Sequence, residues 1–335
     1  MTANGATATV PPTRVIVIGL GAIGREVLKA LAGKRTVRVV AVADPAFAGH
    51  DAGVVAGLEP LGLPVEASVT DALTTPTDVL VVLTTSGSAE MLPLVEAAAA
   101  RQAHVVSTCE DLACADWATP EVAAQIDAVA RAGRIAVLGT GVNPGFVMDR
   151  LPLVLSSACV SVNAVTVERV VDAAKRRAPL RAKVGAGLTV PEFEAGVAAR
   201  TLGHRGLPES CALLGRGLGW RFDEIRTRIG PVVATPEAPR AGIDTGRVAG
   251  LRQTAEGVVG GRTRVSLTLE MSIAAPEPHD RIVIDGDPSL NVLLAGGTHG
   301  DRGTVAAVVN ALGAIRTLAP GLRTVADLPA SGLVA

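Results

Sequence analysis

The sequence predicts an α/β protein with an N-terminal doubly wound parallel sheet and a second, α+β domain built on a mostly antiparallel sheet. Two patterns support this prediction. In the first half of the chain, short apolar runs typical of buried parallel strands alternate with helical segments. Residues 265–273 instead alternate apolar and polar side chains with period two. The chain has 335 residues, 48% of them hydrophobic, which is enough for two cores.

The stretch from Arg14 to Leu31 reads as a buried strand, a glycine-rich turn and an amphipathic helix. In a Rossmann unit of this kind the three glycines have separate roles. The first permits the tight turn, the second lets the backbone approach a pyrophosphate, and the third allows close packing of helix on strand. The turn therefore predicts cofactor contacts at Gly19, Leu20, Gly21, Ala22, Ile23 and Gly24.

A second apolar strand ends in Asp44, about twenty residues after the turn, as a dinucleotide fingerprint requires. A carboxylate at this position accepts hydrogen bonds from the adenosine ribose and repels a 2′-phosphate. The sequence thus favours NAD, with NADP possible if Arg25 or Arg38 reaches the site. A glycine turn in a domain that binds no nucleotide is the alternative interpretation.

Three further strands are expected to end in residues that could meet a ligand, because open α/β sheets bind ligands at the carboxyl ends of their strands. The run at 79–83 is followed by Thr84, Thr85 and Ser86, and the strand after residue 134 by Asn143 and Pro144. We expect these five residues to contact the cofactor.

Cys109 and Glu110 follow the strand that lies between these two. A carboxylate in a partly desolvated cleft can act as a general base, so Glu110 is the catalytic candidate. The alternative is an acid that favours the start of a helix, a role that Asp111 would also suit. For Cys109 a buried structural cysteine is favoured over a thiolate nucleophile, because the adjacent acids disfavour a thiolate.

The pattern divides the chain into a dinucleotide-binding domain at residues 1–148, a substrate and dimerisation domain at 149–297, and a C-terminal helix and tail at 298–335 that return to the first domain. The alternating strand Val265–Ile273 is expected to have one solvated face and to neighbour the segment at 280–286. A sheet edge of this length must be paired or covered, so we expect a homodimer through the second domain.

Composition narrows the function classes. A net charge of −1 without a basic block gives no reason to expect nucleic acid or a membrane surface as partner. No segment has the apolar length of a membrane span, so a cytoplasmic location is expected. The four cysteines form no zinc-ligand spacing, and no metal is expected. The basic cluster from Lys175 to Lys183 could bind an anionic group or form a solvated loop, and His204 and His299 could touch ligand or be ordinary loop residues.

Several segments resemble the 2,4-diaminopentanoate dehydrogenases and the native amine dehydrogenases that share their fold. They are STCEDL (107–112), GTGVNPGFVMD (139–149), DAAKRRAPLRAKVGAGLT (172–189), GHRGLPES (203–210) and GGTHGDRGTVAAVVNAL (296–312). More distantly, the architecture is similar to dihydrodipicolinate reductase, although the His-His and lysine signature of that enzyme is not visible.

The resemblance implies NAD(P)-dependent oxidative deamination of a primary amine or diamino acid, and the reverse reductive amination of a carbonyl with ammonia. The catalytic glutamate of the family falls on Glu110. Asn143 would then position the nicotinamide, and Phe146 and Met148 could form apolar pocket wall or simply core. Two other functions remain open, a reductase of a preformed C=N bond and a dinucleotide-binding protein without turnover.

Overall fold

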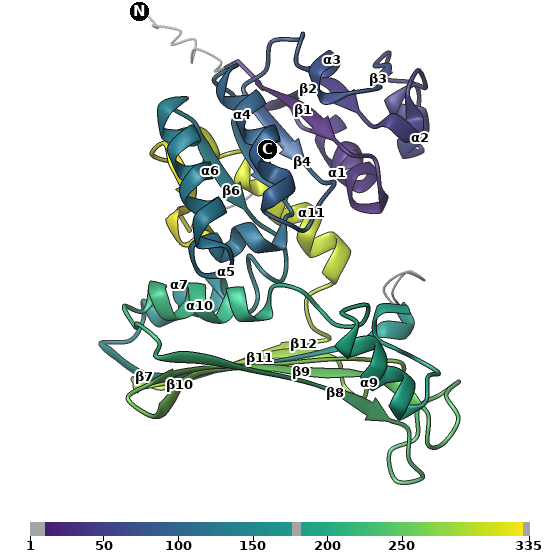
Figure 1. The fold of residues 1–335 in the computed structure, drawn as a ribbon, viewed down its shortest axis with the longest axis vertical. Coiled ribbons are helices and arrows are strands. Elements are labelled where there is room, and N and C mark those ends of the chain that lie inside the picture. Colours follow the sequence, from purple (N-terminus) through teal and green to yellow (C-terminus); the bar gives the residue numbers. More distant parts are fainter. Residues whose placement is uncertain (1–10, 176–181, 331–335) are drawn as a thin grey trace, which may run out of the picture.

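The computed structural model describes residues 11–175 and 182–330, which form two sheet-based domains stacked end to end (Figure 1). The first domain, which is the upper one in Figure 1, contains a seven-stranded parallel sheet in the order β13-β6-β5-β4-β1-β2-β3. Its strands are β1 (Thr13–Ile18), β2 (Val37–Ala43), β3 (Val65–Glu66), β4 (Val79–Val82), β5 (His104–Ser107), β6 (Ala136–Gly139) and β13 (Gly321–Arg323).

The β-branched run in β1 contributes to the core on both faces of the sheet. Val15 and Val17 belong to one core cluster and Ile16 and Ile18 to another, on the opposite side of the sheet. The helices that cover the two faces are α1 (Ala22–Ala32), α2 (Ala52–Ala56), α3 (Val69–Ala72), α4 (Leu92–Ala99), α5 (Ala115–Ala118) and α6 (Pro120–Ala132). The short helices η1 (Pro45–Phe47), η2 (Ala89–Met91) and η3 (Glu110–Cys114) follow β2, β4 and β5.

The second domain is a six-stranded sheet in the order β12-β11-β7-β10-β9-β8, and only the pair β7-β10 is parallel. The mostly antiparallel sheet is therefore confirmed. Its strands are β7 (Ser161–Asp172), β8 (Glu224–Val233), β9 (Val248–Val259), β10 (Arg262–Ser272), β11 (His279–Asp287) and β12 (Leu290–Ala295). In Figure 1 the helices α7 (Arg150–Ser156), α9 (Val190–Ala198) and α10 (Leu207–Gly217) lie on one side of this sheet.

The position of β10 corrects one expectation. The strand at 265–273 is not at an edge, because β10 pairs with β7 on one side and with β9 on the other. The segment at 280–286 lies in β11, which pairs with β7 and β12 instead of β10. Because β10 is paired on both sides, it has no open edge that a second copy of the chain would need to cover. Strand order was not predictable here, because β7 comes more than ninety residues before β10 in the sequence yet lies beside it.

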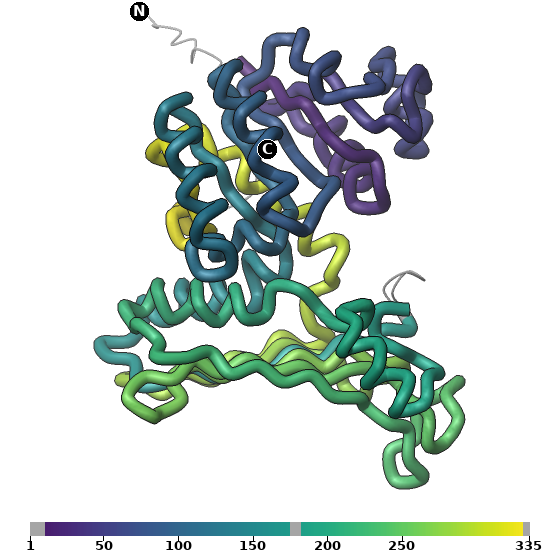
Figure 2. Tube along the Cα trace, viewed as in Figure 1, coloured from purple at the N-terminus to yellow at the C-terminus, as the bar shows by residue number. Residues whose placement is uncertain are grey.

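Two elements connect the domains. Helix α10 places Ala212 and Leu213 in the core of the first domain, and Leu207, Cys211 and Leu214 in the core of the second. Helix α11 (Gly300–Ala311) leaves the second sheet and packs against α1, after which η5 (Ile315–Thr317), β13 and η6 (Val325–Asp327) complete the first domain (Figure 2). The 3-10 turn η4 (Ala173–Lys175) ends β7. No helix in the described ranges is long and apolar enough to span a bilayer.

Candidate active site

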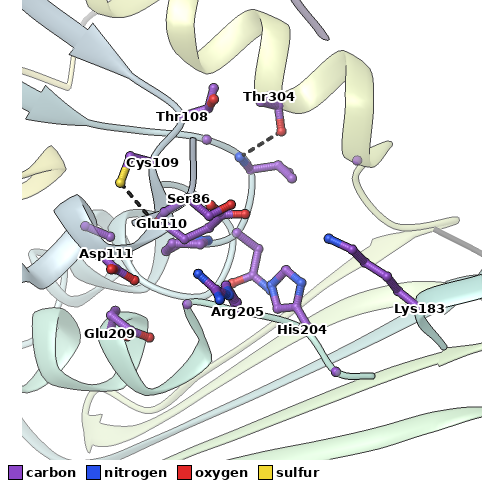
Figure 3. A pocket seen from close by; sticks show the side chains of 18 of the residues that line it. Ser86, Thr108, Cys109, Glu110, Asp111, Lys183, His204, Arg205, Glu209 and Thr304 are labelled. Carbon is purple, nitrogen blue, oxygen red and sulfur yellow. Dashed lines mark hydrogen bonds between the residues drawn. The ribbon is translucent and has the colours of Figure 1, made fainter. Parts of the chain in front are cut away.

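A cavity of about 1330 Å³ lies between the two domains, at the carboxyl ends of the parallel strands. The first domain contributes the glycine turn and the segments after β4, β5 and β6. The second contributes the start of α10, the loop before it and the inner face of the sheet, and the start of α11 closes one side (Figure 3). Nine of the residues predicted to bind cofactor or act in catalysis line it: Gly21, Ala22, Ile23, Thr84, Thr85, Ser86, Glu110, Asn143 and Pro144.

The glycine turn has the geometry needed to hold a pyrophosphate. Gly19 has a φ of +94°, and a Cβ on Gly24 would overlap the carbonyl oxygen of Gly19, so both positions require glycine. Gly21 lines the cavity and has no atom within 4 Å of where its Cβ would lie, so its backbone is open to a ligand. Gly21 also caps α1 without a side-chain hydrogen bond, which leaves N–H groups of the helix start available to an anion.

Asp44 follows β2 directly and braces this turn. Its carboxylate accepts hydrogen bonds from the N–H of Leu20 at 2.6 Å and of Ala46 at 2.9 Å. A carboxylate has about four acceptor positions, so two remain for ribose hydroxyls. Arg25 lies over the Phe47 ring at 5.9 Å, just beyond Asp44. Arg38 is near the amino end of β2, roughly 20 Å of strand from Asp44, too far to reach the same ligand group.

Asn143 is held at the end of β6 by a buried polar network. The Ser210 hydroxyl lies 3.5 Å from Asn143 Oδ1 and donates to Asp149 Oδ2 at 2.7 Å. Complete burial raises the pKa of Asp149, although Ser210 and the N–H groups of Gly145 and Arg150 donate to it. Only 8% of Asn143 is exposed, and its Nδ2 has no hydrogen-bond partner among the described residues. A free donor of this kind fits the carboxamide of a nicotinamide ring.

Phe146 and Met148, the two residues expected in the substrate wall, are not among the residues that line the cavity. Met148 is fully buried in the core of the second domain. Phe146 is 36% exposed. The apolar lining instead comes from residues that the sequence did not single out: Val184, Val197, Leu202, Ile229, Leu251 and Met271.

Glu110 begins η3, immediately after β5, and its carboxylate lines the cavity. Its Oε2 is buried and has no hydrogen-bond partner in the described parts of the chain. The neighbouring Asp111 differs, because Asp111 Oδ2 accepts a hydrogen bond from the N–H of Ser88 at 3.1 Å. A buried carboxylate oxygen without a protein partner is costly unless a ligand meets it, so Glu110 has the environment of a functional acid.

Cys109 is a structural residue in this geometry. It is 1% exposed, and its Sγ lies 3.1 Å from the carbonyl oxygen of Ser86. Burial raises the pKa of the Cys109 thiol to about 12, and the carboxylates of Asp111 and Glu110 add to this rise. The thiolate needed for nucleophilic catalysis is therefore disfavoured.

The two histidines and the basic cluster have different positions. His204 lines the cavity, and its backbone N–H and carbonyl are both held by the Gln253 side chain at 3.1 Å. His299 caps α11, where its Nδ1 accepts from the N–H of Arg302 at 3.3 Å. Lys183 points into the cavity from the side opposite Glu209 (Figure 3). The cluster residues Arg176, Arg177 and Arg181 lie outside the described residues.

Glu209 is a cavity residue that sequence reasoning missed. It lies in the first turn of α10, within the segment GHRGLPES, and looks from the sequence like an ordinary acid at a helix start. The only available signal was its place in a segment shared with the resembling family. Its closeness to Glu110 depends on how α10 packs beneath η3, which no local pattern reveals.

Residues 146–334 match the model of the 2,4-diaminopentanoate dehydrogenase C-terminal domain. The chain belongs to this family. Residues 13–131 match the model of the dihydrodipicolinate reductase N-terminus, which confirms both parts of the resemblance noted in the sequence. The first domain is thus a dinucleotide-binding Rossmann domain joined to the C-terminal domain of this dehydrogenase family.

The chain is similar over most of its length to curated relatives. It is 28% identical to the 2,4-diaminopentanoate dehydrogenase of Acetoanaerobium sticklandii, covering 94% of this chain and 93% of the relative. It is 27% identical to the amine dehydrogenase of Streptomyces virginiae, covering 94% and 95%. Among solved structures, an amine dehydrogenase from Mycobacterium smegmatis has the same fold, with a TM-score of 0.81, 22% identity and coverage of 95% and 96%.

Proposed function

We propose that this protein is an NAD(P)-dependent amine dehydrogenase, which oxidatively deaminates a primary amine or diamino acid and catalyses the reverse reductive amination with ammonia. The observation that carries the proposal is Glu110, which lines one cavity with the dinucleotide turn and whose buried Oε2 has no hydrogen-bond partner among the described residues. Both curated relatives are named as dehydrogenases of this chemistry.

The cofactor would lie along the first-domain wall. The turn from Gly19 to Gly24 would hold the pyrophosphate, Thr84, Thr85 and Ser86 would flank it, and Asn143 and Pro144 would meet the nicotinamide. Bound NAD(P) supplies the hydride acceptor. Asp44 favours NAD, because it offers acceptors to the ribose and repels a 2′-phosphate.

Glu110 would serve two steps. Loss of hydride from the amine-bearing carbon leaves an iminium ion, whose positive charge a nearby carboxylate stabilises. The same carboxylate can then accept a proton from the water that attacks the iminium carbon, giving a carbinolamine that breaks down to ketone and ammonia. A carboxylate whose oxygen lacks a protein partner is free to make both interactions.

The test is to incubate the protein with NAD⁺ or NADP⁺ and a panel of amines that includes sec-butylamine, cyclohexylamine and 2,4-diaminopentanoate. We expect amine-dependent NADH absorbance and, in reverse, NADH oxidation that requires both a ketone and ammonium. Reduction of pyrroline without any dependence on ammonium would support the C=N reductase instead. Cofactor binding without turnover on any substrate would leave the dinucleotide-binding protein.

We also propose a homodimer through the second domain. The support is the sheet face opposite α7, α9 and α10, which none of the described helices covers in Figure 1 and on which Thr166 is exposed and Glu168 is partly exposed. Sedimentation should give twice the chain mass at micromolar concentration, and a monomer would remove the proposal. A cytoplasmic location is proposed because all four cysteines are free, as a reducing compartment would keep them; cell fractionation tests it.

A further inference from the structure

A second carboxylate in the cavity, that of Glu209, shares one unusual feature with Glu110. Both residues line the cavity, and the Oε2 atom of each is buried without a hydrogen-bond partner among the described residues. They come from different domains, Glu110 from η3 after β5 and Glu209 from the first turn of α10. The two elements touch, because a Cβ on Gly206, the residue that caps α10, would lie 3.4 Å from the Cβ of Glu110.

Asn143 provides an independent sign that a polar ligand group belongs here. Its side chain is more than nine-tenths buried, lines the same cavity and leaves Nδ2 without a partner. Three residues that line one cavity thus each carry a buried polar atom without a hydrogen-bond partner in the described parts of the chain. Buried polar groups are almost always satisfied in folded proteins, so the bound ligands are expected to satisfy these three.

The surroundings of Glu209 favour its protonated form. Burial raises the pKa of Glu209 above the ordinary glutamate value, and the carboxylates of Asp111 and Glu110 raise it further, while a hydrogen bond from its own backbone N–H and the charge of Arg205 oppose this rise. The ionisable groups that face Glu209 are Glu110, Asp111 and Cys114 from η3, and Arg205 from the loop before α10. Figure 3 shows three of these, Glu110, Asp111 and Arg205, on the Glu209 side of the cavity.

We propose that Glu209 is a second catalytic carboxylate, which exchanges protons with the substrate nitrogen while Glu110 exchanges them with the substrate oxygen. The inference rests on the proposed amine dehydrogenase function and assigns its two proton-transfer roles to two residues. Paired carboxylates in different environments are a general way to divide acid and base work within one site.

Glu209, Glu110 and the substrate hydroxyl together account for every proton of the deamination. Glu209 carboxylate takes a proton from the substrate ammonium, R₂CH–NH₃⁺, and leaves the free amine that can lose hydride. After hydride loss, Glu110 carboxylate takes a proton from the attacking water, and the iminium becomes the carbinolamine R₂C(OH)NH₂. Protonated Glu209 returns its proton to the nitrogen, the C–N bond breaks, and the hydroxyl proton leaves with ammonia as NH₄⁺. Protonated Glu110 releases its proton to solvent, which is the net proton of the reaction.

The competing explanation is that Glu209 only stabilises the start of α10. The chain contains a control for this, because the first turn of α6, like that of α10, contains a Pro-Glu pair, Pro120 and Glu121. Glu121 is exposed and does not line the cavity. A helix-start role predicts that Glu209→Gln and Glu121→Gln both lower the melting temperature slightly and leave the kinetics unchanged.

The experiment compares Glu209→Gln, Glu121→Gln and the wild type in amine oxidation, ammonium dependence, pyrroline reduction and NADH binding by fluorescence. Pyrroline is assayed at a pH where it is protonated, so that its reduction needs no proton exchange at nitrogen. For Glu209→Gln we expect a loss of about 10²-fold in kcat/KM for amine oxidation and a higher KM for ammonium. Pyrroline reduction and NADH binding should match the wild type.

The pH profile adds a readout that a structural role would not change. Because Glu209 must be unprotonated to take the ammonium proton, the wild-type rate of amine oxidation should fall as pH drops through its raised pKa. The acid limb of the wild type should therefore lie above that of an ordinary glutamate, and it should shift in Glu209→Gln. Infrared difference spectra should contain a protonated carboxyl band that titrates in the same range and is absent from the variant.

Each other outcome overturns the assignment. Wild-type kinetics in Glu209→Gln would remove Glu209 from the reaction, and loss of NADH binding together with thermal stability would make its role structural. A wild type that oxidises no amine would instead overturn the proposed function, and the assignment of Glu209 with it.

Discussion

The glycine turn in the first-domain wall of the cavity offers mainly backbone groups, whereas the second-domain wall is made of side chains. Gly21 and the helix start behind it present N–H groups, and a single side chain, Asp44, supports the turn. On the other side the surface comes from side chains such as Leu202, Met271 and Glu209. Backbone groups cannot be changed by most substitutions. The turn that would hold the pyrophosphate is thus fixed by the fold, and the wall that would hold the substrate can vary with sequence.

The largest effect is expected beneath the second-domain wall, where Arg169 and Asp280 form a buried pair at 2.6 Å with 4% and 0% of their side chains exposed. Arg169 also donates a hydrogen bond to the carbonyl oxygen of Thr298, and Asp280 accepts one from the N–H of Thr298, which lies two residues before α11. Asp280→Ala leaves a buried charge unpaired and should cost about 3–5 kcal/mol of unfolding free energy. Urea unfolding measures this. The double variant Arg169→Met, Asp280→Leu is the control and should recover much of the loss, which would not happen if Asp280 acted only through Thr298.

Two glycines of the dinucleotide turn, Gly21 in the cavity wall and Gly24 beneath it, form a matched pair. Gly24→Ala should cost about 1–3 kcal/mol, because its Cβ would overlap the carbonyl oxygen of Gly19. Gly21→Ala should leave the melting temperature nearly unchanged, since its Cβ meets open space, yet it should weaken NADH binding by filling the pyrophosphate position. Equal effects of both substitutions on stability and binding would contradict the division of roles between the glycines.

Asp44, which supports the glycine turn, is the side chain that should discriminate between the two cofactors. Asp44→Ala removes both the ribose acceptor and the repulsion of a 2′-phosphate, so NAD affinity should fall severalfold or more while its advantage over NADP narrows or reverses. A hydrogen bond to a charged group contributes about 1.5–3 kcal/mol, which sets this scale. Fluorescence titration with NADH and NADPH gives the two affinities. An unchanged ratio would mean that Asp44 only supports the turn through Leu20 and Ala46.

The smallest effect on cofactor binding is expected in the second wall. Met271→Ala enlarges the apolar lining and should leave NADH affinity within about twofold of the wild type. Its effect should appear in the relative kcat/KM of small and bulky amines, where one or two methylenes are worth about 1–3 kcal/mol. A large change in NADH affinity would show that the two walls are not separate.

The sequence predicted the parts of the site that depend on local spacing. The glycine turn and the polar residues after β4, β5 and β6 reach the cavity because they belong to strand-turn-helix units that fold as continuous segments. Asp44 supports the turn without lining the cavity, and its contact with the cofactor stays a prediction. The second wall depends on long-range packing, which local patterns do not encode. Phe146 and Met148 were expected in the pocket wall because they follow Asn143 closely in the sequence. The chain turns after Pro144, however, and neither residue lines the cavity. Glu209 meets Glu110 only because α10 packs between the domains.

The most direct test of the account is the substitution Glu110→Gln, which preserves shape but removes the charge and the basicity of the carboxylate. If Glu110 stabilises the iminium and activates water, amine oxidation should fall by about 10²–10⁴ while NADH binding and melting temperature stay at wild-type values. Pyrroline reduction, which needs no attacking water, should fall less than amine oxidation. Amine oxidation at the wild-type rate in Glu110→Gln would contradict the mechanism.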